Sequence, residues 1–594
     1  MPVTTGGLRW KLRPPAPARR GELADALRVS TITAQLLINR GLADAGPAGG
    51  FLDASFEQLR QPELLPDMER AVERLLAAVS KRQRVVVYGD ADADGLAATA
   101  IMTRLLAMLG CRVEPFVPCR LADGYGLSAE TVERIAGEGA EKPDLLVTVD
   151  CGITSRAEVA ALTAAGVDVI VTDHHQPRDG ALPEATAVVA PRRPGSAYPF
   201  PDISGAAVAF KVAWGLAQAL SPGRRVSPEC REFLNDATAL VALGTVADVC
   251  PLLDENRVLV RYGLKALTAS RHHGLASLVA ASRRRHNGSR RGLSARDVAW
   301  GLAPAINSAG RLGQPGVALD LLMATGAAEA EKLAAALASL NDQRRALGRA
   351  VADEALAAAE ADEHRDAPAI VISSDSWHGG VVGLAAAKLA DRFGRPAAVV
   401  TFGGEGERTH GRGSARGPKG SCLHELFAAC AEHLEEHGGH DGAAGFSVRR
   451  ERFEAFKAAF LKLAGERLAG AERPEDFLDI EAEVPAAELS RDLAGEVERL
   501  APFGEANPEP LFATLGAKLA GTPQAIGSGR SASFRIKAGQ SGGSVRAVGF
   551  GWAQHLAAIS ELGRAGRLDL AYKLKTDDRT GEAELILEDF RART

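Results

Sequence analysis

The sequence predicts an α/β protein of several domains: a parallel-sheet domain joined by a long helix to a smaller α/β domain, followed by a small C-terminal β-barrel. The 594 residues exceed what one hydrophobic core holds. Short apolar strands alternate with Ala/Leu-rich helices from residue 84 onward, as in parallel sheets with right-handed crossovers. Short alternating segments separated by Gly/Ser turns follow residue 470, as in small barrels.

The composition limits the classes of function. A net charge of −5 gives no overall attraction to nucleic acid, so such binding must use local basic patches. The seven cysteines include no C-x-x-C pair, which favours a reducing compartment and argues against zinc or iron–sulfur clusters. No apolar run approaches about 20 residues, and residues 1–20 carry Pro and Arg where a signal peptide needs an apolar core. We therefore expect a cytoplasmic protein with no membrane partner.

Residues 1–80 begin with a Pro/Arg-rich segment and continue with helical spacing at 32–42 and 68–79. We expect this segment to form a helical cap that carries no catalytic or ligand-binding residues. The alternation that follows predicts strands at 85–88, 112–117, 145–149 and 167–172, with helices at 96–109 and 156–165.

The stretch 85–95 is the centre of the functional interpretation. A buried strand runs directly into Asp90, Asp92 and Asp94, and three close carboxylates need a cation between them. A calcium-binding EF-hand loop is excluded, because its twelfth position is Ile101 instead of Glu and a strand precedes it. A solvated acidic turn stays open as an alternative from this stretch alone.

Two further predicted strands end in metal-ligand residue types. Asp150 follows the strand at 145–149, and Asp-His-His at 173–175 follows the strand at 167–172. A His pair alone is more often structural, but three strand ends of the same chemistry favour one shared site. The apolar segment 237–248 also ends in a carboxylate, Asp248, which by itself could be a turn residue.

Four ordered motifs resemble those of the DHH phosphoesterase superfamily: Asp-Ala-Asp-Gly at 92–95, Val-Asp-Cys-Gly at 149–152, Thr-Asp-His-His at 172–175 and Gly-Thr-Val-Ala-Asp at 244–248. Five further stretches are similar to the RecJ family of single-strand-specific exonucleases: 123–128, 306–313, 377–383, 439–446 and 502–510. The resemblance covers about residue 80 to the end. The chain departs from it at Ala91, where relatives usually carry an aromatic residue, at Ala305, where they often have Arg, and at Ala506, which replaces Gly.

The resemblance implies a two-metal centre. Its ligands would be Asp92, Asp94, Asp150, His174 and Asp248, with Asp90 and His175 as further ligands or neighbours of ligands. Adjacent side chains of an extended chain point in opposite directions, so we assign His174 to the metal and His175 to the scissile phosphate or a bridging role. Oxygen and imidazole ligands without a thiolate suit two Mn²⁺ or Mg²⁺ ions, with Mn²⁺ favoured by the histidine. The catalytic set would be Asp92, Asp94, His174, His175 and His440.

Other segments provide candidates for binding nucleic acid. The basic run 283–291 could attract phosphates or be a solvated loop. The resemblance makes Asn307 and Arg311 contacts to the strand, where the residues alone indicate only a turn. Glycines at 411–417 and 438–440 would let backbone N–H groups approach phosphate, as implied for a DHHA1 domain in which His440 contacts the nucleotide. Arg120, Ser414 and Arg416 are then the candidates for holding a terminal 5′-phosphate.

The remaining segments complete the expected architecture. Residues 326–364 have helical spacing and no proline, and at 1.5 Å per residue would span on the order of 50 Å as the connector. The C-terminal barrel would be of the OB type, with Phe534, Phe550 and Trp552 either stacking on bases or packing inside. The expected domains are a cap at 1–80, the DHH domain at 81–315, connecting helices at 316–366, the DHHA1 domain at 367–468 and the OB domain at 469–594.

The resemblance implies a single-strand-specific 5′-to-3′ exonuclease that releases 5′-mononucleotides in DNA recombination and repair. Its substrate would be single-stranded DNA with a 5′ end, its protein partners a helicase and a single-strand-binding protein, and its state a monomer. Two alternatives stay open. A phosphodiesterase of short oligonucleotides or nucleoside phosphates would need neither a barrel nor a long connector. A replication scaffold that has lost its metals would not need the ligands, all of which are present.

Overall fold

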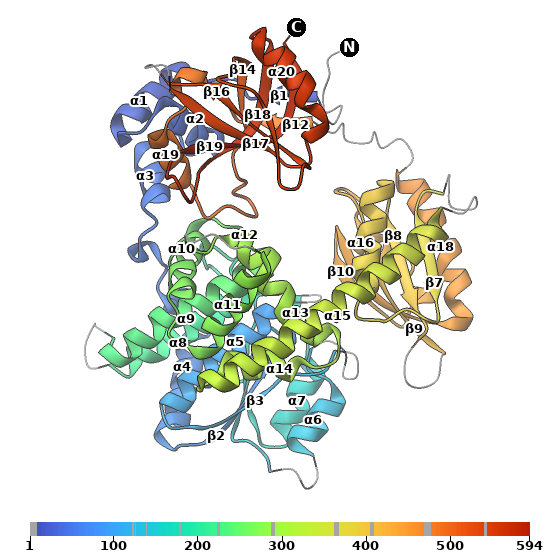
Figure 1. Cartoon of the computed structure of the whole chain (residues 1–594). Coiled ribbons are helices and arrows are strands. Elements are labelled where there is room, and N and C mark those ends of the chain that lie inside the picture. Colours follow the sequence, from blue (N-terminus) through green and yellow to red (C-terminus); the bar gives the residue numbers. More distant parts are fainter. Residues whose placement is uncertain are drawn as a thin grey trace.

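The computed structural model describes residues 9–120, 124, 126–137, 139, 141–177, 180–221, 226–286, 292–360, 367–403, 409–468, 477–539 and 543–593. Residues 123 and 125 of one motif, 287–291 of the basic run and 361–364 of the expected connector lie outside these ranges. Figure 1 shows three units: a large α/β unit in blue to green, a small α/β unit in yellow to orange, and a β unit in red that also carries the dark blue N-terminal helices. No helix in the described ranges is both long and apolar enough to cross a membrane.

The large α/β unit is built on a parallel sheet, as predicted. Its strand order is β3-β2-β4-β5-β6, and every neighbouring pair is parallel. The strands are β2 (Arg84–Gly89), β3 (Arg112–Phe116), β4 (Leu145–Val149), β5 (Asp168–Thr172) and β6 (Ala187–Val189). The inward residues of the central strands, such as Val85 and Val147, are fully buried because helices cover both faces. The carboxyl ends of β2, β4 and β5 therefore meet at one edge.

Helices form two layers around this sheet. They are α4 (Met68–Ser80), α5 (Ala93–Met108), α6 (Ala129–Ala136), α7 (Arg156–Ala164), α8 (Gly205–Ala219), α9 (Pro228–Ala247), α10 (Asp254–Thr268), α11 (His273–His286), α12 (Ala295–Asp297), α13 (Ala303–Arg311) and α14 (Pro315–Met323). A π-helical turn, Val298–Leu302, joins α12 to α13. Helices α6 and α7 pack on one face, and α4, α5 and α8 on the other. Because α5 starts directly after Asp92, its first turn brings the acidic motif to the sheet edge.

A single long helix links the two α/β units, as the sequence predicts. Helix α15 (Ala327–Ala359) has 33 residues. Ala334 and Leu337 belong to the core of the large unit, whereas Val351 and Ala355 belong to a core of the small unit. Each end of the helix is thus anchored in a different core (Figure 1).

The small α/β unit contains a five-stranded mixed sheet of order β10-β11-β9-β8-β7. Its elements are β7 (Ile370–Ser374), α16 (Val382–Phe393), β8 (Ala397–Thr401), β9 (His410–Arg416), α17 (Leu423–Ala429), β10 (Glu436–His440), β11 (Ala443–Arg449) and α18 (Phe453–Leu468). Only β7 and β8 are parallel to each other. The glycine-rich segment at 411–417, expected to approach phosphate through its backbone, is mostly strand β9. A Cβ at Gly411 would lie 2.6 Å from the Phe402 ring and one at Gly413 2.2 Å from the Phe446 ring, so these two glycines make room for aromatic packing.

The β unit contains a seven-stranded, largely antiparallel sheet of order β13-β14-β18-β19-β17-β16-β15, consistent with the predicted OB-type fold. Its elements are β12 (Phe477–Ile480), β13 (Ala482–Glu483), α19 (Arg491–Glu498), β14 (Phe512–Ala517), β15 (Gln524–Ile526), β16 (Ser531–Lys537), β17 (Ser544–Gly549), α20 (Leu556–Arg564), β18 (Leu568–Thr576) and β19 (Ala583–Ala592). Phe534 and Trp552 are buried in its core, whereas Phe550 is 68% exposed. Of the three aromatic candidates, only Phe550 could stack on a base in this conformation.

The N-terminal residues do not form one separate cap. Strand β1 (Arg9–Leu12) pairs with β12, and α1 (Pro17–Leu27), α2 (Thr31–Asn39) and α3 (Ala45–Asp53) share the hydrophobic core of the β unit. Helix α4 instead packs in the core of the large unit. Sequence spacing finds α2 and α4 but cannot reveal a partner more than 400 residues away.

A buried arginine joins the β unit to the large unit. Arg257 of α10 is 2% exposed and donates hydrogen bonds to the carbonyl oxygens of Phe51 (2.8 Å), Arg499 (2.9 Å) and Leu500 (2.7 Å). Its guanidinium also lies 3.7 Å from the centre of the Phe51 ring. Nearby, the backbone N–H of Leu252 donates to the carbonyl of Glu505 at 2.8 Å. The turn at 502–507 therefore reaches the large unit just after Asp248.

Ala506 in this turn gives a test of backbone strain. Its φ of 57° lies in the left-handed region, where a side chain other than glycine is unfavourable. Ala506→Gly is expected to raise the free energy of unfolding by about 0.5–1 kcal/mol. Ala428→Gly, at an exposed position inside α17, is the matched control and should lower it by about 1 kcal/mol. Denaturant unfolding of both full-length variants checks the opposite signs, and a loss of stability in Ala506→Gly would contradict the assignment.

Candidate metal centre

Carboxylates and imidazoles from four segments converge at the carboxyl edge of the parallel sheet. Asp90 and Asp92 follow β2, Asp150 follows β4, His174 and His175 follow β5, and Asp248 follows α9. We call these six residues the acidic rim. Strand ends of a parallel sheet meet at one edge, so residues far apart in the sequence become neighbours.

The rim offers overlapping sets of ligand atoms. Within each of three groups the ligand atoms lie within 4.8 Å of one another: Asp90, Asp92 and Asp150; Asp150, His174 and His175; and His174, Asp248 and Cys250. The first two groups share Asp150, and the last two share His174. This continuous row of donors is long enough to serve more than one ion.

Two buried atoms at the middle of the rim make no hydrogen bond to the described residues. Asp150 Oδ1 and His174 Nε2 are buried, have no hydrogen-bond partner among the described residues, and lie 3.1 Å apart. Burial, followed by repulsion from Asp94 and Asp92, raises the pKa of Asp150 well above its usual range. Asp150 also has a φ of 61°, a strained conformation that such sites often retain. Buried ligand atoms without hydrogen-bond partners and clustered carboxylates are typical of sites for divalent cations, so these residues suit Mn²⁺ or Mg²⁺.

Strand alternation predicted that the side chains of His174 and His175 point in opposite directions, but in the structure they do not. Both offer a nitrogen to the same group with Asp150, and their ring centres lie 4.4 Å apart. The prediction fails here because β5 ends at Thr172, so the histidines occupy a turn instead of an extended strand.

Asp173 is a functional candidate that the sequence prediction did not include. Its Oδ1 accepts hydrogen bonds from the backbone N–H groups of His174 (2.7 Å) and His175 (3.1 Å) and lies 2.7 Å from His175 Nδ1. Burial lowers the pKa of His175, but Asp173 outweighs it and raises that pKa to about 9. Carboxylates that orient metal-site histidines are common, so the Asp-His-His sequence itself carried the signal.

Asp94, expected to be a metal ligand, accepts hydrogen bonds from the start of α8. Its oxygens accept from the N–H groups of Gly205 (2.6 Å) and Ala206 (2.9 Å), and it is 2% exposed. Burial, followed by repulsion from Asp248, raises its pKa to about 7. Asp94 is in none of the three ligand groups found among the described residues. Its position supports a role in fixing α8 against the rim.

Gly205 leaves room for Asp150, which gives a second test. A Cβ at Gly205 would lie 2.3 Å from Asp150 Oδ1, while one at Gly215 of the same helix would lie 3.3 Å from the flexible Met68 Sδ. Gly205→Ala should displace the carboxylate and weaken Mn²⁺ binding roughly tenfold or more. Gly215→Ala is the control and should leave it within about twofold. Calorimetric titration with Mn²⁺ measures both, and equal affinities would contradict the placement of Asp150.

The predicted phosphate-binding residues of the large unit lie around the rim. Arg120 donates to Asp90 Oδ1 at 2.9 Å and to Asp92 Oδ2 at 2.8 Å. Burial raises the pKa of Asp92, but Arg120 outweighs it and the pKa is lowered. The Asn307 side-chain oxygen accepts from the N–H of Ala93 at 2.7 Å, so it holds the start of α5. Arg311 donates to the carbonyl of Gly380 at 3.2 Å, a contact between the two α/β units.

The candidate phosphate-binding residues of the small unit, Ser414, Arg416 and His440, do not lie together: the first two are on β9 and the third is at the end of β10. Ser414 and Arg416 lie on the same face of β9 as Arg412. The sequence prediction missed Arg412, which donates to the Arg120 carbonyl at 2.8 Å. Arg416 also donates to Ser414 Oγ at 2.8 Å, beside Gly383 in the first turn of α16. His440 is exposed at the end of β10, and among the described residues no hydrogen bond or ion pair joins it to the rim.

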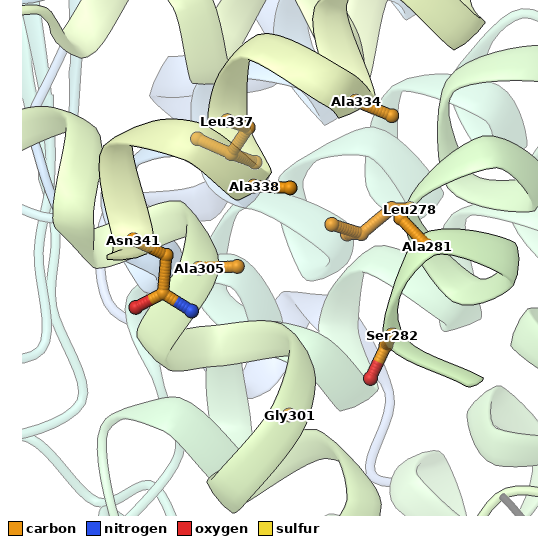
Figure 2. Close-up of a pocket in the computed structure, with 9 residues that line it drawn as sticks. All are labelled: Leu278, Ala281, Ser282, Gly301, Ala305, Ala334, Leu337, Ala338 and Asn341. Carbon is orange, nitrogen blue, oxygen red and sulfur yellow. The ribbon is translucent and has the colours of Figure 1, made fainter. Parts of the chain in front are cut away.

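The pocket in Figure 2 is separate from the rim. It is a small pocket of about 20 Å³ between α11, α13 and α15 and is lined mainly by aliphatic residues, among them Leu278, Leu337 and Ala305, the position noted above as a departure from the family. Asn341 and Ser282 are its polar side chains. None of its lining residues is ionisable, so it offers no chemistry for phosphate hydrolysis and we place the candidate active site at the rim.

Three family domains match the chain. Residues 84–245 match the DHH family, N-terminal domain; residues 366–466 match the DHHA1 domain; and residues 480–589 match the RecJ OB domain. The first covers the strands that carry most of the rim, and the second covers Ser414, Arg416 and His440.

Similar proteins carry the name single-stranded-DNA-specific exonuclease RecJ. The chain is 36% identical to that of Thermus thermophilus, over 89% of this chain and 72% of the relative, and 34% identical to that of Escherichia coli, over 80% and 82%. It is 33% identical to that of Bacillus subtilis over 85% of this chain but only 61% of that longer relative. A crystal structure of the T. thermophilus RecJ with Mn²⁺ matches with a TM-score of 0.77 and 32% identity, over 99% of this chain and 80% of that one.

Proposed function

The chain belongs to the RecJ family, and from that premise we propose that it is a metal-dependent 5′-to-3′ exonuclease specific for single-stranded DNA, which releases 5′-mononucleotides. The observation that carries the proposal is the acidic rim, in which three ligand groups overlap at Asp150 and His174, each of which has a buried atom without a hydrogen-bond partner among the described residues. Solved relatives hold Mn²⁺ or Mg²⁺, the ions that this set of oxygen and nitrogen donors suits.

The ligand groups suggest how the chain would hold two ions. Asp90, Asp92 and Asp150 would hold one, and His174 and Asp248, again with Asp150, the other. Bound ions would lower the pKa of a water molecule and stabilise charge on the attacking and leaving oxygens of an in-line displacement. No side chain then needs to act as a covalent nucleophile.

Other residues would hold the rim and the substrate in place. Asp94 and Asn307 fix the first turns of α8 and α5, on which the rim rests. His175, oriented by Asp173 and 55% exposed at its side chain, would face the scissile phosphate. Asp173 raises the pKa of His175, which favours an imidazole N–H that would donate to a phosphate oxygen.

A site for the terminal 5′-phosphate would set the direction of cleavage. Arg412 ties β9 to Arg120, so Ser414 and Arg416 lie on the strand that meets the rim. A hydroxyl, a guanidinium and the first turn of α16 together are suited to bind a phosphate. Arg311 would contact strand phosphates at the mouth of the channel, and His440 would contact the nucleotide near the scissile bond. The same proposal includes a role in recombination and repair, a cytoplasmic location and a monomeric state, with a helicase and a single-strand-binding protein as partners. These parts of the proposal rest only on the resemblance to the family.

The direct test uses labelled oligonucleotides with Mn²⁺. We expect 5′-labelled single strands to release labelled mononucleotide at once, 3′-labelled single strands to shorten progressively, and blunt duplexes to stay intact. A 5′-hydroxyl strand should react more slowly than a 5′-phosphate strand, because the terminal contact is lost. Enzyme treated with a chelator is the control. Cleavage of dinucleotides alone would favour the short-oligonucleotide phosphodiesterase, and equal attack on duplex would reject the proposal.

A further inference from the structure

We propose that His174, Asp248 and Cys250 form a binding site for a thiophilic divalent ion, Zn²⁺ or Cd²⁺, and that occupancy of this site inhibits the enzyme. The three side chains form one end of the row of donors described above, and their ligand atoms lie within 4.8 Å of one another. Cys250 Sγ lies 3.4 Å from Asp248 Oδ2, and His174 Nε2 lies 3.7 Å from the same oxygen.

The turn after α9 brings Cys250 to this position. Helix α9 ends at Ala247, and Val249 has a φ of 56°, so the chain reverses between Asp248 and Cys250. A β-branched residue in this conformation is strained and is usually held there by its surroundings. Val249 is 64% exposed, whereas Cys250 is 7% exposed and joins Asp248 in the ligand group. The turn thus places both side chains toward His174.

The histidine is an independent sign of a ligand. His174 is 5% exposed, and its Nε2 has no hydrogen-bond partner among the described residues. A buried ring nitrogen without a partner is costly unless a cation or a water molecule binds it. His174 belongs to the group that contains Cys250, and its Nε2 lies 3.7 Å from Asp248 Oδ2, so an ion bound by this histidine can also reach the sulfur.

The donor set differs from what Mn²⁺ and Mg²⁺ prefer. Those ions favour oxygen ligands, whereas one thiolate, one imidazole and one carboxylate suit Zn²⁺ or Cd²⁺, with water in the remaining position. When the ion binds, the S–H bond breaks, the proton passes to solvent, and the electron pair that remains on sulfur forms the metal–sulfur bond. The ion would occupy His174 and Asp248, which the proposed function assigns to a catalytic ion. Inhibition therefore rests on the proposed function, whereas the binding site itself rests on the geometry.

A nearby cysteine provides the matched control. Cys151 is also buried and follows the rim residue Asp150, but its Sγ lies 3.9 Å from the Tyr88 carbonyl oxygen. It belongs to none of the three ligand groups among the described residues. None of the seven cysteines, all of which lie in the described ranges, forms a disulfide, so the comparison does not disturb one.

The binding test follows the ultraviolet absorption of the cadmium–thiolate bond in chelator-treated, full-length protein. We expect Cd²⁺ to produce this absorption in the wild type and in Cys151→Ala, and to produce markedly less in Cys250→Ala and Cys250→Ser. Circular dichroism confirms that each variant is folded, and two substitutions guard against the failure of one. Equal absorption in the wild type and in both Cys250 variants would overturn the site.

The inhibition test adds Zn²⁺ or Cd²⁺ to the Mn²⁺-supported cleavage of single-stranded DNA, with each variant compared with its own uninhibited rate. The concentration for half-inhibition should rise roughly tenfold or more in Cys250→Ala and stay unchanged in Cys151→Ala. Equal inhibition of Cys250→Ala and wild type would overturn the inhibitory role. If the wild type cleaves no DNA, the proposed function fails, while the absorption test still decides whether the site exists.

Discussion

Asp150→Asn is expected to lower the Mn²⁺-dependent cleavage rate by about a thousandfold or more, because two ligand groups share this carboxylate. Asparagine keeps the shape of the side chain and tolerates a φ of 61°, so the turn after β4 should persist. What changes is the charge and one oxygen of the rim. Without metal, the variant should be at least as stable as the wild type, since burial and neighbouring carboxylates disfavour ionised Asp150.

The control is Asp168→Asn, at the opposite end of β5. Asp168 pairs with Arg74 at 2.6 Å, is 54% exposed at its side chain and lies far along the strand from the rim. Its loss should change activity by less than about twofold. Release of labelled mononucleotide and calorimetric Mn²⁺ titration measure the two variants. More than a tenth of wild-type activity in Asp150→Asn would show that the rim does not hold the catalytic ions.

Lys211→Met is expected to lower the free energy of unfolding by about 3–5 kcal/mol, because it leaves the buried Glu255 carboxylate without its cation. Both side chains are fully buried, and Lys211 Nζ donates to Glu255 and to the Arg60 carbonyl. Glu255 also accepts from the Arg60 N–H at 2.6 Å and from the Tyr198 hydroxyl. This network joins α8, α10 and the segment before α4.

A double variant separates charge from packing. Adding Glu255→Gln to Lys211→Met removes the unpaired charge, keeps an oxygen that accepts from the Arg60 N–H, and supplies an amide N–H that can donate to the Tyr198 hydroxyl, so part of the lost stability should return. Lys388→Met breaks the exposed pair with Asp353 and should cost less than about 1 kcal/mol. Denaturant unfolding of full-length protein compares them. Similar losses for Lys211→Met and Lys388→Met would contradict the role of burial.

The sheet and most of the rim could be predicted because each rests on a local pattern. Apolar strands that end in Asp92, Asp150 or His174 need only the rule that parallel strands present their carboxyl ends at one edge. Strand alternation misplaced His175 because it assumed that β5 continues past Thr172. The sequence did not identify Cys250 as a candidate ligand, because no residue pattern in this apolar segment predicts that the chain turns back at Val249.

Glycines and long-range partners were also beyond sequence patterns. A glycine such as Gly413 can either let the backbone approach a phosphate or leave space for the Phe446 ring. The sequence is the same in both cases, and only the fold distinguishes them. Asp94 belongs to a metal-binding motif, yet its oxygens accept from α8 more than 100 residues later. In both cases the deciding neighbour lies far along the chain.

The pairing of β1 with β12 has a consequence for biosynthesis. Residues 9–53 leave the ribosome well before the segment that pairs with β1 and covers their apolar side chains, among them Leu36 and Leu37, and this segment begins at Phe477. At about 5–20 residues per second, these helices wait roughly 20 to 85 s for their partner. During translation these helices therefore expose an apolar surface to which chaperones can bind. A prematurely terminated polypeptide would keep this surface exposed.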